Sequence, residues 1–182
     1  MSFPTSKQFK SEKLYFLLPV DKPGIPERVR SEATKEGLFG KFECHISVVV
    51  EKSAVSIRAG ILKNKNPEKA KEEIISLFES LAWEYDLTDT FSLQEKSYNR
   101  KELDERGLED EPEHIRRSIV QVVKMPDIGL FYKKISEILN IELSTPIAHI
   151  TIFAYSDYEA KKTRGIGISS KEDFEMFNKK FI

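Results

Sequence analysis

Apolar side chains recur along the chain with two periods, one of two residues and one of three to four. Apolar or β-branched runs predict strands at residues 14–19, 43–50, 54–61, 85–91, 118–124 and 147–154. Helical spacing predicts helices at residues 26–37, 67–82 and 126–139 and a short one opened by Ser170. The strands at 43–50 and 54–61 are close enough to form a hairpin. Strands interspersed with helices predict a mixed α/β or α+β domain.

Residues 95–113 break this pattern. Charged side chains dominate the segment, and Leu103 and Leu108 are its only aliphatic residues. This composition predicts a solvated, mobile loop that contributes little to a core. A lid over an active site is the alternative, because functional loops often lie beside sites.

Length and charge limit the classes of protein to consider. The 182 residues predict a single domain over 1–182, and 29 Lys and Arg against 30 Asp and Glu give a net charge of −1. This balance argues against a protein that coats nucleic acid, but a small phosphorylated ligand remains possible. One cysteine, an N-terminus without an apolar signal core and the lack of a spanning segment predict a monomeric, cytoplasmic protein without membrane contact.

Two of the three histidines have nearly the same neighbours. His45-Ile46-Ser47 and His149-Ile150-Thr151 each read histidine, aliphatic, hydroxyl, and each lies within a predicted strand. Because successive side chains on a strand point to opposite faces, each histidine shares a face with its hydroxyl residue. A single histidine on a strand is commonly structural, but the repetition favours a paired functional role.

This pair of motifs resembles the 2H phosphoesterase superfamily, which is named for two His-x-Ser/Thr motifs and includes 2′-5′ RNA ligase-like cyclic phosphodiesterases. The resemblance implies an α+β fold of two similar lobes, with two antiparallel sheets flanking a central cleft. It also implies that His45 and His149 are catalytic and that Ser47 and Thr151 bind phosphate. The separation of the motifs is long for the family, which the charged segment 95–113 explains.

The chemistry of these side chains agrees with that assignment. Hydrolysis of a cyclic phosphodiester needs a base for water and an acid for the departing alkoxide, and imidazole titrates near neutral pH. Two hydroxyls can donate hydrogen bonds to the non-bridging oxygens. The reaction requires neither metal nor cofactor, and the nearly symmetrical motifs leave open which histidine is the base.

Other constellations are weaker. A metal site from His45, His149 and Glu43 is conceivable, but no zinc-binding spacing is present. Cys44 faces away from His45 on its strand and is expected to be a core residue. Gly165-Ile166-Gly167 is not a nucleotide-binding loop and is read either as a turn or, with Arg164, as the rim of the cleft.

Four further residues are candidates for substrate binding. Arg58 falls on the polar face of its predicted strand, close to His45 if the hairpin forms, and Tyr155 follows the second motif. Arg117, with Arg116, opens a strand and could bind a second phosphate. Arg164 precedes the glycine pair. A solvated or structural role is the alternative for each of them.

The sequence therefore predicts a metal-independent phosphodiesterase that hydrolyses a 2′,3′-cyclic phosphate on an RNA end or nucleotide. A cyclic di- or oligonucleotide is a further substrate within the same chemistry. The alternatives are a 2′-5′ RNA ligase and a non-catalytic module that binds RNA ends or nucleotides.

Overall fold

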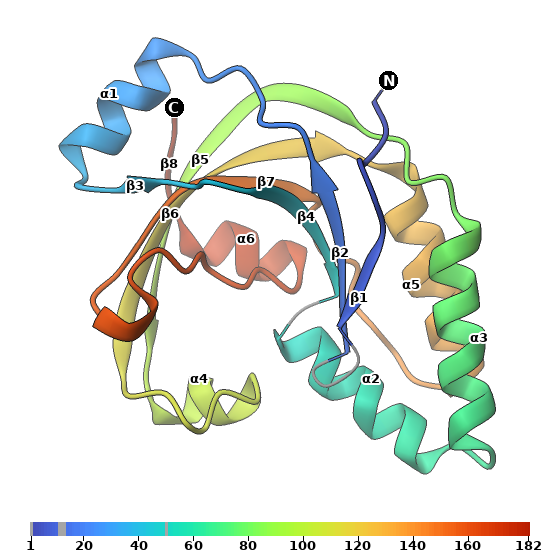
Figure 1. Cartoon of the computed structure of the whole chain (residues 1–182). Helices are drawn as coiled ribbons and strands as arrows, with labels where there is room; N and C mark the ends of the chain where they lie inside the picture. The colour runs from blue at the N-terminus through green and yellow to red at the C-terminus, as the bar shows by residue number, and fades with distance from the viewer. Residues whose placement is uncertain (1, 11–13, 50) are drawn as a thin grey trace.

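The computed structural model describes residues 2–10, 14–49 and 51–182, which form an α+β fold around one antiparallel sheet (Figure 1). The strands are β1 Gln8–Lys10, β2 Tyr15–Val20, β3 Phe39–Gly40, β4 Cys44–Val49, β5 Asp86–Tyr98, β6 His114–Lys124, β7 His149–Ser156 and β8 Asn178–Phe181. The helices are α1 Glu27–Lys35, α2 Glu51–Lys63, α3 Pro67–Ser80, α4 Arg100–Glu105, α5 Pro126–Leu139 and α6 Lys171–Phe177, with a 3-10 turn at Glu159–Lys161. None of these helices has the length and hydropathy needed to cross a bilayer.

The sheet has the order β1-β2-β4-β7-β6-β5-β8, and β3 pairs with the end of β7. The strands thus form one hydrogen-bonded sheet rather than the two sheets expected from the sequence. Its halves meet where Ile46 of β4 pairs with Ile150 of β7. Both His-x-Ser/Thr motifs therefore lie on adjacent strands at the centre of the sheet.

The predicted strand at 54–61 is wrong, because these residues belong to helix α2. The positions Val55, Ile57, Ala59 and Ile61 alternate, but Ala54, Ile57 and Ile61 also follow helical spacing. These last three side chains are buried in the core. The hairpin between 43–50 and 54–61 consequently does not exist, and the last residue of its first strand lies outside the described residues.

The loop expected at 95–113 is shorter than predicted, because residues 95–98 and 100–105 form regular structure and only the turns at 106–113 lie between α4 and β6. Residues 95–98 complete β5, Asn99 caps α4 by accepting a hydrogen bond from the Glu102 N–H at 2.9 Å, and β6 begins at 114. Arg106 and Glu111 within this segment are buried. The high charge did not prevent burial because acidic and basic side chains of the segment form ion pairs in the interior.

The remaining predicted elements are present, with shifted ends. The strand at 85–91 runs on to Tyr98, and the short strand β8 was not predicted. The caps behave as the sequence indicates: Asn66 accepts a hydrogen bond from the Lys69 N–H, and Ser170 from the Asp173 N–H. Gly37 follows the end of α1 and has a φ of 64°, the left-handed conformation that commonly terminates a helix.

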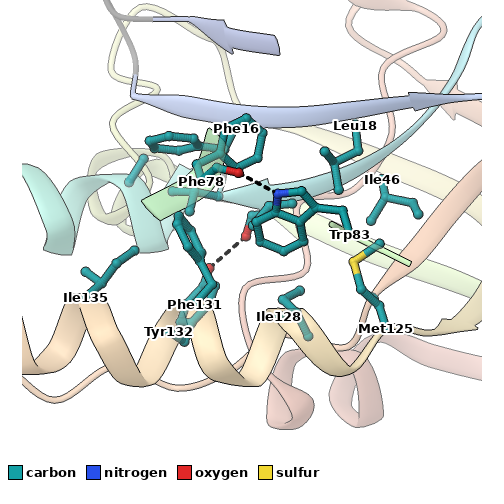
Figure 2. Packing of buried hydrophobic residues seen from close by; sticks show 14 of the residues in the cluster. Phe16, Leu18, Ile46, Phe78, Trp83, Met125, Ile128, Phe131, Tyr132 and Ile135 are labelled. Carbon is teal, nitrogen blue, oxygen red and sulfur yellow. Dashed lines mark hydrogen bonds between the residues drawn. The ribbon is translucent and has the colours of Figure 1, made fainter. Parts of the chain in front are cut away.

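The main core lies between α3, α5 and one face of β2 and β4 (Figure 2). Trp83 is fully buried, and its indole N–H donates to the Phe78 carbonyl at 2.8 Å. The ring of Phe131 meets the Trp83 ring edge-on, with centroids 5.3 Å apart. This packing occupies one face of the central strands and leaves the alternate side chains for the opposite face.

Replacing Phe131 by alanine should lower the free energy of unfolding by about 3–5 kcal/mol, because the cavity left among the aromatic rings cannot collapse fully. Its neighbour Leu130 is 44% exposed on the same helix, so Leu130→Ala should change stability by about 0.5 kcal/mol or less. Urea denaturation of the two variants measures both effects. An equal loss of unfolding free energy in the two variants would show that α5 is not packed as described.

Candidate active site

The two motifs form an array of four polar side chains on the face of the sheet opposite the main core. In β4, Cys44, Ile46 and Val48 are buried in the core, so His45 and Ser47 point the other way. In an antiparallel ladder, the pairing of Ile46 with Ile150 places Ser47 beside His149 and His45 beside Thr151. The two histidines are then diagonal neighbours, and the Cα atoms of diagonal neighbours lie roughly 7–8 Å apart in such ladders.

The two imidazoles have different surroundings. His149 is 7% exposed, and its Nδ1–H donates to the Ile147 carbonyl at 2.8 Å, which leaves Nε2 as the reactive nitrogen. Burial lowers the pKa of His149, and the hydrogen bond to Ile147 opposes this effect. Burial, followed by the nearby charges of Lys41 and His149, lowers the pKa of His45 to about 4.

The four side chains line a cavity of about 720 Å³. Phe9, Tyr15 and Leu17 of β1 and β2 contribute apolar and aromatic side chains, and Lys10 of β1 contributes a charged one. Residues 164–168, together with Lys41 and Glu51, form the other side. The histidine and hydroxyl groups therefore share one cavity with aromatic, apolar and charged side chains.

Behind the charged side, the Glu51 carboxylate forms ion pairs with three arginines. It lies 3.1 Å from Arg106 Nη1, 3.4 Å from Arg116 Nη1 and 3.6 Å from Arg164 Nη2. Glu51 is the first residue of α2 and has a φ of 46°, a left-handed conformation that is unusual outside glycine. The cluster therefore connects α2, the turn after α4, β6 and the cavity wall.

A second buried carboxylate, Glu111, completes this arrangement. It lies 2.6 Å from Arg116 Nη2 and 2.8 Å from Lys161 Nζ, and it also accepts from Arg164. The Arg116 guanidinium stands 4.2 Å above the centre of the Tyr98 ring. Arg164 is therefore held by Glu51 and Glu111 at the edge of the cavity that it lines.

The glycine pair belongs to the cavity wall, in agreement with the rim interpretation of Gly165-Ile166-Gly167. A Cβ on Gly167 would lie 1.8 Å from Glu51 Oε2, which is closer than any side chain can approach. A Cβ on Gly165 would lie 3.2 Å from the side chain of Thr151. Both glycines let the backbone approach groups that larger residues would displace.

Tyr155 and Arg117, two of the expected substrate-binding residues, lie on the other face of the sheet. Val120 pairs with Thr151 and Ile119 with Phe153, so Ile152 is an extra residue that forms a β-bulge. Beyond this bulge, the side chains of β7 point to the opposite faces from those expected by simple alternation. Tyr155 therefore packs beside α1. Arg117 pairs with Glu36 at 3.3 Å and lies over the Tyr155 ring.

Arg58 does not line the cavity either, because its segment is helical. It lies on α2 close to Gly107, where a Cβ would be 3.1 Å from Arg58 Nη2. Of the four candidates for substrate binding, only Arg164 is brought to the cavity.

The sequence reasoning missed several residues of the site. Lys41 and Tyr15 line the cavity, and Glu51 and Arg106 form its buried support. No motif marks them, since they come from separate elements. One signal was available in the sequence, the arginine pair Arg116-Arg117. Arg116 of this pair is fully buried and pairs with Glu51 behind the cavity.

Comparisons of the chain with protein-family models, with curated proteins and with solved structures find no match. Within residues 2–10, 14–49 and 51–182, no three His, Cys, Asp or Glu side chains converge in a geometry that could hold a metal ion. The chemistry of the site therefore has to follow from its own geometry.

Gly167→Ala should destabilise the protein by about 3 kcal/mol or more, because the added methyl group separates the Glu51 carboxylate from its buried arginines. Gly129→Ala is the matched control. It adds the same methyl group within α5, where nothing lies within 4 Å, and should stabilise by about 0.5–1 kcal/mol. Chemical denaturation of both variants tests this, and a neutral Gly167→Ala would refute the close approach.

Proposed function

We propose that this protein is a metal-independent cyclic phosphodiesterase, which hydrolyses a 2′,3′-cyclic phosphate on a nucleotide or RNA end with two histidines. The observation that supports this most is the array of His45, Ser47, His149 and Thr151 on one cavity. Two adjacent strands supply one imidazole and one hydroxyl each, so a single phosphate can contact all four groups. Few other reactions need this symmetrical set of side chains.

The proposed reaction transfers two protons. One histidine accepts a proton from water as the water oxygen attacks phosphorus. The other donates a proton to the ribose oxygen as the bond between that oxygen and phosphorus breaks. The hydroxyls of Ser47 and Thr151 donate hydrogen bonds to the non-bridging oxygens, which carry the charge of the transition state.

The surroundings of the histidines favour His45 as the base in hydrolysis. Burial lowers the pKa of both histidines, but the charge of Lys41 adds to this effect at His45, whereas the hydrogen bond to Ile147 opposes it at His149, so His45 is the better candidate for the neutral base. His149 has its Nδ1–H committed to the Ile147 carbonyl, so that Nε2 is the atom that carries the donated proton. A bound phosphate anion favours this protonated form.

The arrangement of the sheet also supports the family resemblance. Strands β1, β2 and β4 form one half, and β7, β6, β5 and β8 form the other, with one motif on the inner strand of each. A two-lobed 2H fold has this division into halves, with the motifs facing one cleft. The Ile46–Ile150 pair then joins the two lobes into one sheet.

Two alternatives use the same cavity. A 2′-5′ RNA ligase would run the same in-line chemistry in reverse, and a non-catalytic module would bind RNA ends or nucleotides without turnover. An enzyme is favoured over the binding module because both histidines and both hydroxyls are present and line the cavity. Product formation separates the enzyme from the binding module, and joining of RNA ends identifies a ligase.

The test is incubation with cyclic phosphodiesters in EDTA, with products identified by phosphorus NMR. The substrates are 2′,3′-cyclic nucleotides, cyclic dinucleotides and RNA ending in a cyclic phosphate. Turnover should survive EDTA and fall by roughly 10²–10⁴-fold in His45→Ala and in His149→Ala, the usual contribution of a general acid or base.

His114→Gln is the control for these variants. The third histidine is also buried, but it lies outside the cavity, with Nδ1 2.6 Å from the Pro112 carbonyl. Its substitution should leave turnover within a few-fold of the wild type, provided that circular dichroism shows a folded protein. Absence of turnover on every substrate, or turnover that both alanine variants retain, would refute the proposed function.

A further inference from the structure

Three cationic side chains among the described residues line the cavity, Lys10, Lys41 and Arg164, and the two-histidine chemistry uses none of them. We propose that Lys41 binds a second phosphate group of the same substrate molecule, so that the preferred substrate carries a phosphate besides its cyclic phosphodiester. The inference rests on the proposed function, and it names the class of nucleotide that the site takes.

The position of Lys41 is set by hydrogen bonds of its backbone and of its ammonium group. Its backbone N–H donates to the Ile152 carbonyl at 2.9 Å, which attaches it to β7 next to the bulge. Its Nζ donates to the Thr163 carbonyl at 3.1 Å. The side chain is half-buried and lines the cavity beside residues 164–168.

The charge of Lys41 has no carboxylate partner within 4.0 Å among the described residues. Arg164, the other cation of this wall, is paired with both Glu51 and Glu111. Glu43 is close enough to favour the charged form of Lys41, but burial has the larger effect and lowers the pKa of Lys41. A half-buried ammonium in this position is stabilised when a ligand anion supplies the missing charge.

The position also separates Lys41 from the phosphate held by the histidines. Lys41 lies between β3 and β4, four residues before His45, and its backbone meets β7 at Ile152, beyond Thr151. It therefore lies past one end of the four-residue array. On a ribose, the 5′ position lies away from the 2′ and 3′ oxygens, so a 5′-phosphate extends out from the cyclic phosphate.

A second lysine strengthens the positive charge at this end of the cavity. Lys22 Nζ donates to the Lys41 carbonyl at 3.2 Å. The described residues contain no carboxylate within 4.0 Å of Lys22 Nζ. Lys22 thus places a second ammonium group beside the Lys41 backbone, next to the residues that line the cavity.

The test compares adenosine 2′,3′-cyclic phosphate with the same nucleotide carrying a 5′-phosphate. Wild-type protein should show a kcat/KM about tenfold or more higher for the 5′-phosphorylated form, and the preference should shrink as salt is added. Lys41→Gln should abolish the preference, whereas Lys41→Arg should keep it. Lys133→Gln removes the same charge from an exposed position on α5 and should leave the preference intact.

A dinucleotide that ends in the cyclic phosphate identifies the source of the second phosphate. A higher kcat/KM for the dinucleotide indicates an RNA end, and a higher value for the 5′-phosphorylated mononucleotide indicates a small nucleotide. Equal kcat/KM with and without the 5′-phosphate would overturn the proposal. A loss in Lys41→Gln of the same size for both mononucleotides would also overturn it, because Lys41 would then serve the cyclic phosphate.

A binding experiment separates this inference from the proposed function. If no substrate is hydrolysed, the proposed function fails, but adenosine 2′-phosphate and adenosine 2′,5′-bisphosphate can still be compared by calorimetry. Tighter binding of the bisphosphate to wild-type protein, lost in Lys41→Gln, would uphold the second phosphate site. Equal affinities would refute it.

Discussion

The burial of the Glu51 carboxylate is the interaction on which the rest of the site depends. Taking one carboxylate and its arginines out of water costs several kcal/mol per ion, and only a full set of partners offsets this cost. Arg106, Arg116 and Arg164 supply those partners from three separate parts of the chain. Because Arg164 belongs to the cavity wall, the ion cluster determines where that wall stands relative to the central strands.

The central strands complete the site through their register. One core face and one polar face follow from alternation, and the Ile46–Ile150 pair brings the polar positions of β4 and β7 together. A slip of one residue in either strand would send the histidine of that strand into the apolar core. The packing of α3 and α5 against the other face, which stabilises the register, is therefore also what positions the imidazoles (Figure 2).

Local patterns predicted most elements and the shared face of histidine and hydroxyl within each motif, because strand alternation is a property of neighbouring residues. That the two motifs meet was implied by the family resemblance. The helix at 54–61 was missed since its apolar positions satisfy two periods. The buried charges of 95–113 were missed because part of their compensation comes from residues remote in sequence, such as Glu51 for Arg106 and Arg164 for Glu111. The bulge at Ile152 and the close approach of Gly167 to Glu51 depend on register and tertiary contact, which a single sequence does not display.

The central claim is that the two histidines act on one phosphate, and NMR titration of ¹⁵N-labelled imidazoles tests it most directly. In the free protein, His45 should titrate at a pKa of about 4, and His149 below its usual 6.5 with the proton on Nδ1. Adding adenosine 2′-phosphate should raise both pKa values, because the anion stabilises both imidazolium forms. A response of only one histidine, or of neither, would contradict the account.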